Sequence, residues 1–351
     1  MLKKLFTNKD STNSMVGVDL GVATIKIVEL KNENKKPTLV TYGVSSGDRQ
    51  ATKEIHQNIS PDLIYLMQQA RTTTTNVVGA LPTSSVFSTI IDFPKMPTKE
   101  IDSAIKWEAR KLIPLPLEKM SLHWHILPTV GKTKDDDSIK VILSAAPTET
   151  TTKYLKIFKA ANLSLLSLET EIKALQRSLL TPTDKTSLII DIGANNTNMI
   201  IYDNNLPLLN KNIDIGGETL TSHIAKTINI NFERAAQLKK QLGMSTFDQA
   251  SHPAVKAMKF AIDNIIIRDI KHLITVLGNS TQNKINNIIL TGGGAHLKNL
   301  DKYLENELKI NTRVGDPWHK ISYPKELKSE LGKIGTKMSV AIGLALKVVE
   351  K

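Results

Sequence analysis

The sequence predicts an α/β protein with two domains of one type and a smaller α+β unit inserted into the first. Three observations predict this class. Residues 16–30, VGVDLGVATIKIVEL, form two β-rich arms around a turn of small residues. Residues 187–203 repeat that layout, with Asp191 and Gly193 in the places of Asp19 and Gly21. A chain of 351 residues is long enough for two hydrophobic cores.

The turn after Asp19 has the composition of an anion-binding loop. Small residues let backbone N–H groups approach and surround a phosphate, and Asp19 would face that anion through a metal ion or water. An ordinary hairpin with an incidental aspartate explains this stretch equally well on its own. The recurrence at Asp191 favours a site in which the two aspartates face each other across a cleft.

The first domain continues with a strand over 37–44 and a helix over 60–71. Ser60 is expected to be the N-cap of this helix and Pro61 its first residue. A polar threonine linker, residues 72–75, then precedes a strand over 76–81.

Residues 84–162 are expected to form the inserted unit, close to the minimum size that folds alone. Its expected strands are at 86–93, 122–127 and 139–146, with a charged loop at 132–137. The first expected helix has Ile101, Ala104, Ile105 and Leu112 on one face. The second begins at Thr148 and has Tyr154, Leu155, Phe158 and Ala161 on its inner face.

A strand over 163–168 and a helix over 171–180 lead through a linker at 181–186 into the second domain. The remaining expected elements are a turn at 214–218 before a helix near Ser222, helices over 232–242 and 255–277, a strand over 288–291, a helix after Ala295, and a C-terminal helix over 338–349.

Two groups of glycines in the second half indicate close approach of the backbone to something else. Gly292, Gly293 and Gly294 follow a buried strand and would let a flat ligand face lie against the main chain. Gly343 costs its helix about 1 kcal/mol relative to alanine, which indicates close helix packing or a hinge.

Composition excludes several classes of function. There is no cysteine, so disulfides, thiolate metal sites and a cysteine nucleophile are excluded. Aromatic residues make up 5%, which disfavours base stacking on nucleic acid. The net charge of +12 is spread along the chain and indicates a solvated surface with some preference for an anionic membrane face. No transmembrane run or secretory signal is evident, so we expect a cytosolic protein.

Three motifs in this order resemble the actin, Hsp70 and sugar-kinase superfamily. They are the loop at Asp19–Gly21, the loop at Asp191–Gly193 and the triple glycine at Gly292–Gly294. The insert resembles the relocated subdomain of the FtsA branch. Within that branch the chain resembles the PilM family of type IV pilus assembly proteins, through KWEARKLIPLPLE at 106–118, residues 291–300 and VAIGLAL at 340–346.

The resemblance implies an actin-like, Hsp70-type two-domain ATPase fold with an FtsA-like insert. The implied parts are a flexible N-terminus at 1–14, a first domain (1A) at 15–83, 163–185 and 332–351, the insert (1C) at 84–162, a second domain core (2A) at 186–222 and 285–331, and a helical subdomain (2B) at 223–284.

The resemblance also implies an ATP site, with Mg²⁺ near Asp19 and Asp191. The implied phosphate contacts are Gly21, Val22, Ala23, Thr24 and Lys26 in the first loop, and Gly193, Ala194, Asn195, Asn196 and Thr197 in the second. The implied ribose contacts are Gly216, Gly217, Glu218 and Lys239, and the adenine contacts are Gly292, Gly293, Gly294 and Ala295.

The implied partner is the cytoplasmic N-terminal peptide of PilN, an inner-membrane pilus protein, which would place this chain at the cytoplasmic face of that membrane. The peptide would lie in a groove between the first domain and the insert, with Trp107, Ile113, Leu115 and Leu117 as lining residues. Alternatively, these four residues are the core of the insert. The resemblance also allows self-association.

Two positions depart from the superfamily pattern. Ala236 stands where the family helix often carries a glutamate, although Lys239 is retained. Asn198 follows Thr197 where an FtsA-type loop often has an acidic residue. Because asparagine cannot act as a general base, we assign no catalytic residue and expect weak ATP hydrolysis at most.

Other functions stay open at this point. An FtsA-like filament-forming division protein is closest, but that family's amphipathic C-terminal helix is missing here, so we expect a partner to recruit the chain to the membrane. A small-molecule kinase would need a carboxylate base, for which Asp92, Asp102 and Asp203 are candidates. An Hsp70-like chaperone would need a further substrate domain. His123 and His125 share one strand face and are expected to pack or face solvent rather than bind zinc.

Overall fold

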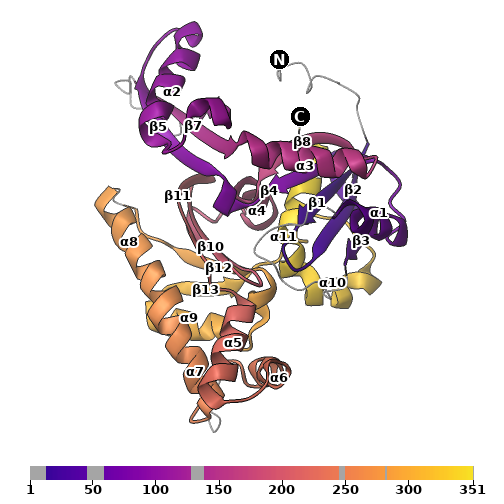
Figure 1. Ribbon diagram of the computed structural model, residues 1–351, viewed down its shortest axis with the longest axis vertical. Helices are drawn as coiled ribbons and strands as arrows, with labels where there is room; N and C mark the ends of the chain where they lie inside the picture. The colour runs from indigo at the N-terminus through magenta and orange to yellow at the C-terminus, as the bar shows by residue number, and fades with distance from the viewer. Residues whose placement is uncertain (1–12, 46–58, 128–137, 245–249, 281–282, 351) are drawn as a thin grey trace.

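Two five-stranded sheets form the two halves of the molecule, and a three-stranded sheet projects from the first (Figure 1). The computed structural model describes residues 13–45, 59–127, 138–244, 250–280 and 283–350. The expectations for the N-terminal segment before residue 13 and for the charged loop at 132–137 therefore lie outside the described residues.

The first sheet has the order β3-β2-β1-β4-β8. Its strands are β1 (Ser14–Leu20), β2 (Ile25–Glu33), β3 (Lys36–Val44), β4 (Asn76–Leu81) and β8 (Ser164–Thr170). The first three strands form an antiparallel meander, and β4 and β8 continue from β1 in parallel.

The second sheet repeats this topology in the order β11-β10-β9-β12-β13. Its strands are β9 (Thr186–Ile192), β10 (Thr197–Asp203), β11 (Leu206–Ile213), β12 (Asn287–Thr291) and β13 (Asn311–Val314). β9, β10 and β11 form the meander, and β12 and β13 are the parallel strands. The predicted repetition of one strand–turn–strand unit is confirmed.

The third sheet consists of β5 (Phe87–Pro94), β7 (Ser138–Pro147) and β6 (Met120–Ile126), in that order. Helix α2 (Thr98–Leu112) covers one face of this sheet and buries Ile101, Ile105 and Ala109 against it. The expectation that Leu112 faces inward is wrong. The helix ends at Leu112, and the next residue, Ile113, turns into the core instead.

Helix α3 (Thr148–Ala160) packs on the first sheet although it follows β7 directly. Tyr154, Ile157 and Phe158 are buried there, whereas Leu155 is exposed, contrary to the expected inner face. The buried face of α3 therefore runs through Tyr154, Ile157 and Phe158, and Leu155 lies on the solvent side of the helix.

Helix α1 (Ser60–Gln69) begins without the predicted serine cap. The N-cap residue is Ile59, and the hydroxyl of Ser60 donates a 3.0 Å hydrogen bond to the carbonyl of Ile157 in α3. Ser60 is buried at this contact, so its hydroxyl joins two helices and does not cap its own. Helix α4 (Glu171–Leu179) is capped by Thr170, whose hydroxyl accepts from the N–H of Lys173.

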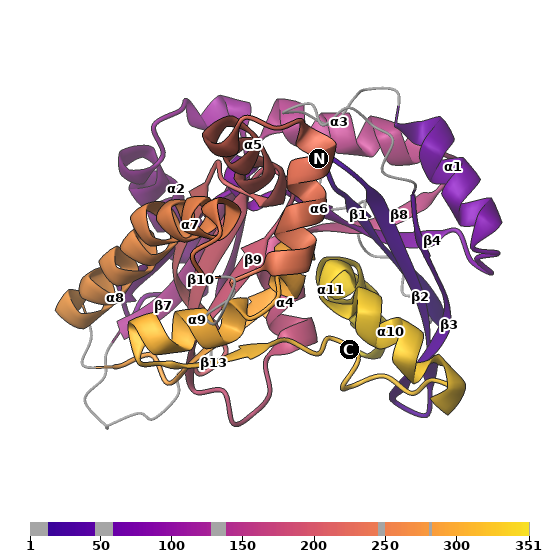
Figure 2. The same ribbon diagram turned by 90° about the horizontal axis from the view of Figure 1, so that it is seen from below.

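The second half carries most of the remaining helices (Figure 2). They are α5 (Gly217–Ile228), α6 (Phe232–Leu242), α7 (Pro253–Ala261), a π-helical stretch (Ile262–Ile267), α8 (Arg268–Ser280) and α9 (Leu300–Leu308). The predicted single helix over 255–277 therefore contains a π-helical segment. Helix α5 begins at Gly217, earlier than expected, because Gly216 and Gly217 are part of the second loop described below.

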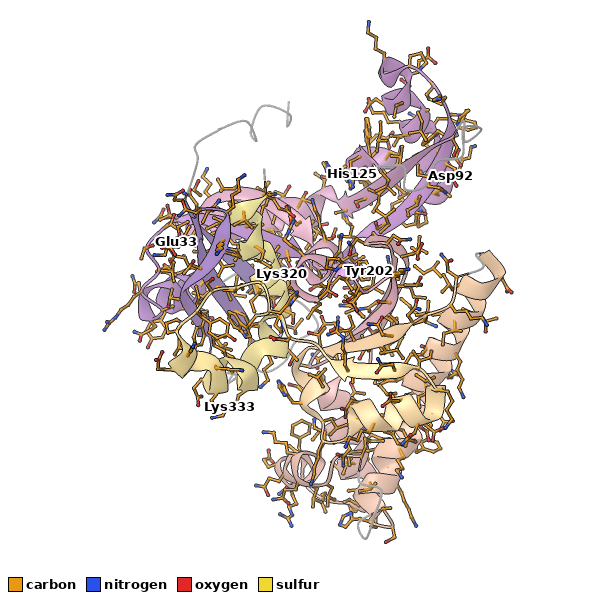
Figure 3. All side chains as sticks on the ribbon, turned by 180° about the vertical axis from the view of Figure 1, so that it is seen from behind. Glu33, Asp92, His125, Tyr202, Lys320 and Lys333 are labelled. Atoms are coloured by element: carbon orange, nitrogen blue, oxygen red, sulfur yellow. The ribbon has the colours of Figure 1, made fainter. Side chains whose placement is uncertain are left out.

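Helices α4 and α11 (Ser339–Ala345) cross between the two large sheets, and α10 (Lys328–Ile334) precedes α11. A Cβ on Gly343 would lie 1.9 Å from the carbonyl oxygen of Ala174, so close helix packing is the reason for this glycine. Tyr202 on β10 donates a 2.6 Å hydrogen bond to the carbonyl of Ile172 (Figure 3). These contacts join both halves through one shared core.

Candidate functional site

The turn between β1 and β2 holds an ion pair. Nζ of Lys26 donates to Oδ2 of Asp19 over 2.9 Å, and both side chains are largely buried. Burial by itself would lower the pKa of Lys26. The neighbouring negative charges, first that of Asp19 and then those of Asp191 and Glu171, outweigh burial and raise it. Lys26 therefore stays charged and faces three carboxyl groups.

Asp191 ends β9 at the equivalent place in the second half. Burial, followed by the negative charge of Asp19, raises the pKa of Asp191 to about 6, and Lys26 offsets part of that effect. The structure thus brings the two aspartates, which are far apart in sequence, into one electrostatic environment. Asp191 has no cation of its own across its hairpin, where its strand partner is Asn198.

Glu171 is a third acidic residue in this environment, and the sequence did not single it out. Its Oε2 accepts hydrogen bonds from the backbone N–H and the hydroxyl of Thr83, at 2.8 and 2.9 Å, and from the amide of Asn198 at 3.3 Å. Burial, then the charge of Asp19, raises its pKa to about 7 despite those donors. An acidic first helical residue is a common sequence feature, so only the fold distinguishes this one.

The turn between β9 and β10 is docked on the start of α5. The N–H of Gly217 donates to the carbonyl of Gly193 (2.9 Å), and the N–H of Glu218 donates to that of Ala194 (2.8 Å). A Cβ on Gly216 would lie 2.4 Å from the Ala194 carbonyl oxygen, so only glycine fits. The predicted phosphate and ribose segments therefore form one continuous surface.

Lys239 on α6 connects to the same surface. Its Nζ donates to the carbonyl of Gly217 and to the hydroxyl of Thr221. Burial lowers the pKa of Lys239 to about 8. Ala236, one turn earlier on α6, is half-buried and supplies no polar group.

The glycine turn after β12 lies against the second loop. Gly292 has a φ of 80°, and a Cβ there would lie 2.4 Å from Oδ1 of Asp191. A Cβ on Gly294 would lie 2.2 Å from Cγ2 of Ile192. Gly293 is exposed and has room around it. The N–H of Gly292 donates to the carbonyl of Thr336, which ties this turn to the segment before α11.

Five of the predicted ligand contacts are buried, namely Asp19, Gly216, Gly292, Thr197 and Ala295. Thr197 is fully buried and its hydroxyl donates to the carbonyl of Ile215 over 2.6 Å. Ala295 is 3% exposed and belongs to the core of the second half. These last two side chains hold the loops in shape, while the half-buried turns at 21–24 and 193–196 remain accessible.

The four predicted partner-binding residues occupy different environments. Trp107 is 59% exposed and Leu115 is 50% exposed, whereas Ile113 is buried and Leu117 is half-buried against the core of the third sheet. Trp107 lies on the outer side of α2, with Nζ of Lys111 3.1 Å from the ring centroid. The alternative that Trp107 belongs to the core of the insert is wrong.

A second surface lies around β6 and β8, where charged residues at the end of the first sheet act electrostatically on a histidine of the third sheet. Each of these strands is an edge of its sheet. His123 and His125 project from β6 with ring centroids 6.4 Å apart, and Figure 3 labels His125 on the third sheet. Burial, then the charges of Lys173 and Lys347, lowers the pKa of His123, while Glu169 on β8 offsets part of this effect. We call these five residues the β6–β8 junction.

Glu169 anchors the junction to the rest of the first half. Its carboxylate accepts from Lys347 at 2.7 Å and from Arg177 at 3.0 Å, and Arg177 also donates to the carbonyl of Gly343. Among the described residues, no group of three or more His, Asp or Glu side chains is placed to hold a metal ion.

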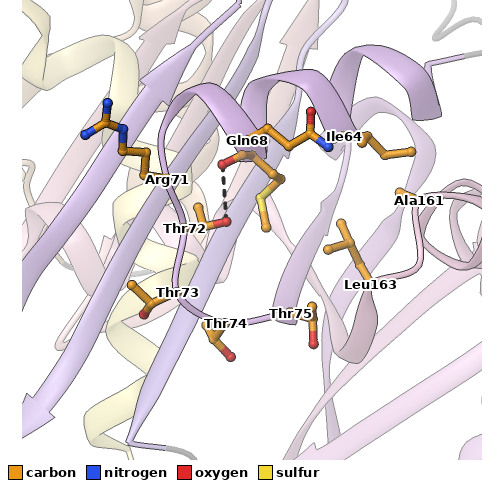
Figure 4. Close-up of a pocket in the computed structure, with 10 residues that line it drawn as sticks. Ile64, Gln68, Arg71, Thr72, Thr73, Thr74, Thr75, Ala161 and Leu163 are labelled. Carbon is orange, nitrogen blue, oxygen red and sulfur yellow. Dashed lines mark hydrogen bonds between the residues drawn. The ribbon is translucent and has the colours of Figure 1, made fainter.

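Two surface hollows lie away from these loops. One is bordered by α1, the threonines at 72–75 and Leu163 (Figure 4). The other lies beside Asp184, Arg313 and His319. Neither includes a predicted site residue, and both are open to solvent. We therefore assign the candidate site to the glycine loops, where buried charges and close backbone contacts coincide.

The carboxylates considered for a kinase are engaged elsewhere. Asp92 pairs with Lys140 on the third sheet, Asp102 accepts from Lys106 and Trp124, and Asp203 accepts from Thr186. None of the three appears among the charges that act on Lys26, Asp191 or Glu171.

Comparison with known proteins decides the family. The family model described as "Type IV pilus assembly protein PilM" matches residues 17–349. The chain belongs to the PilM family. A chain from the structure described as "PilM-PilN type IV pilus biogenesis complex" aligns with a TM-score of 0.79 and 27% identity, covering 96% of this chain and 99% of that one.

More distant proteins share parts of the sequence or the fold. FtsA from Staphylococcus epidermidis is 26% identical over 163 residues, and FtsA from Bacillus subtilis is 25% identical over 146 residues. These matches cover 40% and 37% of this PilM-family chain and about a third of each relative, 34% and 33%. MreB5 of Spiroplasma citri bound to ADP aligns at 15% identity with a TM-score of 0.54, covering 95% of both chains, which shows the actin-like fold alone.

No helix in the described part of this PilM-family chain is both long and apolar enough to cross a membrane.

Proposed function

We propose that this PilM-family protein is an ATP-binding adaptor that passes the state of its nucleotide site to a pilus protein partner. The observation that carries the proposal is the meeting of three separate segments around the Asp191 loop. The Asp19 turn acts on Asp191 electrostatically, the start of α5 docks on its loop, and the backbone of Gly292 lies against its carboxylate.

Asp19 and Asp191 fit the proposed Mg²⁺. Mg²⁺ is commonly held by one or two carboxylates together with phosphate oxygens and waters. The raised pKa of Asp191 reflects an unfavourable negative charge beside Asp19, which a divalent cation would relieve. A bound cation would supply charge neutralisation for the phosphates. Lys26 adds a fixed positive charge beside the first loop.

The remaining assignments follow the loops. The turns at 21–24 and 193–196 would contact phosphates through backbone N–H groups, with Thr197 supporting the second turn from inside. Gly216, Gly217, Glu218 and Lys239 would border the ribose, and the turn from Gly292 to Ala295 would border the adenine. Glycine at Gly216, Gly292 and Gly294 lets these segments pack against the Asp191 loop, because a Cβ at any of the three would clash with that loop.

We propose weak ATP hydrolysis at most. Asn198 has no ionisable group, and its amide donates to Glu171. Glu171 has a pKa of about 7 and is the acid whose protonation would change near neutral pH. Its Oε2 already accepts three hydrogen bonds, two of them from Thr83, which limits its freedom to orient a water molecule.

The proposed partner is the N-terminal peptide of PilN, and its proposed site lies between the first half and the insert. The β6–β8 junction supports this choice, because β6 and β8 are each the outer strand of their sheet and the charges near β8 act on His123 of β6. An extended peptide could add to either edge by main-chain hydrogen bonds. Trp107 and Leu115, exposed on the outer side of the insert, are proposed as further apolar contacts.

The division of the chain into 1A, 1C, 2A and 2B subdomains, with the boundaries given above, remains a proposal, as does a location at the cytoplasmic face of the inner membrane. Helix α3 packs on the first sheet, so we expect the insert to move relative to α3 and not with it.

A titration tests the proposal. Purified protein is titrated by calorimetry with Mg²⁺–ATP and, separately, with a peptide of the PilN N-terminus from the same organism. We expect saturable binding of both, loss of nucleotide binding in Asp19→Ala, and retention of peptide binding in that variant. Absence of nucleotide binding at any Mg²⁺ concentration would contradict the proposed site, and phosphorylation of a small hydroxyl compound would favour a kinase.

Self-association is a separate proposal, since the same fold occurs in a protein whose structure is a double helical filament, MamK. That likeness, at 13% identity, concerns the fold alone. Sedimentation velocity with and without Mg²⁺–ATP distinguishes a monomer from an assembly.

A further inference from the structure

Glu171 connects the candidate nucleotide site to the start of the insert. The 3-10 turn Thr83–Ser85 lies between β4, in the first sheet, and β5, the first strand of the third sheet. Thr83 donates twice to Glu171, once through its backbone N–H and once through its hydroxyl. The insert therefore leaves the first sheet at a residue held by a carboxylate of the site.

The same carboxylate is connected to the second half. Asn198 on β10 donates to Glu171 at 3.3 Å, and Asn212 on β11 donates to Asn198 at 2.5 Å. β11 also contacts β5 of the third sheet, and Figure 1 shows β11 beside the base of that sheet. One chain of hydrogen bonds thus runs from the edge of the second sheet, through Glu171, to the start of the insert.

We propose that the Glu171 carboxylate couples occupancy of the nucleotide site to the position of the insert by holding or releasing Thr83. This inference rests on the proposed function, because it names how the nucleotide site would regulate the peptide site. It assigns Glu171 and Thr83 a positioning role and no chemical step.

The physical reason is competition for one acceptor. A buried carboxylate keeps its hydrogen-bond donors because losing them leaves charge unsatisfied. A nucleotide with its cation brings new charge and new donors beside Asp19 and Asp191, whose charges already act on Glu171. Glu171 then shifts toward those groups, Thr83 loses its acceptor, and the turn at 83–85 is freer to rotate. His123 and His125 of the β6–β8 junction then move with the third sheet while Glu169 stays on the first sheet, so the geometry of the junction changes.

Thr83 offers a matched set of variants. Thr83→Val keeps the side-chain shape but removes the hydroxyl donor, and Thr83→Ser keeps the hydroxyl. Thr89→Val is the control, since Thr89 lies on β5 within the insert and its hydroxyl makes only a 3.5 Å contact with the carbonyl of Ile90. All three variants leave the loops at Asp19 and Asp191 unchanged.

Hydrogen exchange of the full chain gives the first measurement. Mg²⁺–ATP is expected to increase exchange at the backbone amides of residues 83–87, because the N–H of Thr83 is donated to Glu171. In Thr83→Val these amides should already exchange faster without nucleotide, and the change caused by Mg²⁺–ATP should shrink. Thr83→Ser and Thr89→Val should behave as the wild type does.

The ratio of PilN-peptide dissociation constants with and without Mg²⁺–ATP gives the second measurement. We expect a ratio of about fivefold or more in the wild type, the usual lower range of coupling between sites, and less than about twofold in Thr83→Val. The ratio must equal the change that the peptide causes in nucleotide affinity, because coupling is reciprocal.

The outcomes separate the two ideas. If the wild type binds no nucleotide or no peptide, the proposed function is wrong. If both bind, the coupling through Glu171 and Thr83 is overturned by either of two results. One is that hydrogen exchange at residues 83–87 does not change when Mg²⁺–ATP is added. The other is that Thr83→Val keeps the wild-type ratio of peptide dissociation constants. Loss of coupling in Thr89→Val as well as in Thr83→Val would also overturn it, because the effect would then not depend on Glu171.

Discussion

The two large sheets have the same strand order, yet the aspartates at their first turns lie in different charge environments. In the first half, Asp19 faces Lys26 across the hairpin and forms a 2.9 Å ion pair. In the second half, Asp191 faces Asn198, which brings no charge, and the pKa of Asp191 rises to about 6. The charge of Lys26 therefore acts on both aspartates, although only Asp19 is paired with it across a hairpin.

The halves also differ in where they are enlarged. The first gains its extra sheet after the fourth strand, β4, and the second gains helices α5 to α8 after the third strand, β11. The first enlargement begins beside Glu171, and the second begins with the glycines that dock on the Asp191 loop. Each addition thus starts at the candidate site.

The third difference concerns the position two residues before each aspartate. Gly17 occupies it in β1, and Ile189 occupies it in β9. A Cβ on Gly17 would lie 2.0 Å from the carbonyl oxygen of Ala341 in α11, whereas Ile189 is a fully buried member of the shared core. Helix α11 therefore lies directly on the first sheet.

Placing valine at both positions should produce the largest contrast. Gly17→Val forces α11 away from β1 and is expected to lower the free energy of unfolding by about 3 kcal/mol or more. Ile189→Val removes only one methylene from the shared core and should lower the free energy of unfolding by about 1 kcal/mol. Urea denaturation monitored by circular dichroism measures both, and similar losses would show that the close approach at Gly17 is not needed.

Neutralising the two aspartates should change stability in opposite directions. Asp19→Asn leaves the largely buried Lys26 without its ion-pair partner and is expected to cost roughly 1–3 kcal/mol. Asp191→Asn removes a carboxylate that is disfavoured by burial and by Asp19, and should stabilise the protein by roughly 1–3 kcal/mol at pH 7.5. Both should lose Mg²⁺–ATP binding. The same sign of stability change in both variants would remove the distinction between the halves.

Stability should fall as pH rises from about 4.5 to 7.5. The pKa of Glu171 rises from 4.5 to about 7 on folding and that of Asp191 from 3.8 to about 6, so the folded state retains protons that the unfolded state releases in this window. The resulting loss is roughly 3–6 kcal/mol for the two groups together. Thermal melts across this range in wild type and Glu171→Gln measure it. The variant should show a flatter profile, and a wild-type stability that increases with pH would contradict these shifts.

The smallest contrast separates two adjacent glycines of the second half. Gly216→Ala would place its Cβ 2.4 Å from the Ala194 carbonyl oxygen, so it should cost about 1–3 kcal/mol and weaken nucleotide binding. At Gly217 the nearest atoms are 3.6 Å away, so Gly217→Ala should stay within about 0.5 kcal/mol of wild type. Equal effects on nucleotide affinity would argue against the docking of α5 on the second loop as its cause.

Much of the fold could be predicted because its signals are local. The β-branched residues around Asp19 and Asp191 predicted both hairpins. Gly343 predicted either close helix packing or a hinge, and the contact with Ala174 is close helix packing. Predictions from local sequence were wrong where a side chain bonds to a residue far away in the sequence. Ser60 has the sequence context of a helix cap, yet its hydroxyl donates a hydrogen bond to the carbonyl of Ile157, ninety-seven positions away.

By itself, the sequence determined the two glycine–aspartate loops, their order and the family they resemble, because backbone geometry and β periodicity are properties of short segments. Only the tertiary structure decided that Lys26 is shared between two aspartates, that Glu171 joins them, and that Trp107 faces outward. Charge and burial depend on what lies nearby in space, and for Glu171 those neighbours come from β1, β9, β10 and the turn at Thr83. No local pattern around residue 171 contains them.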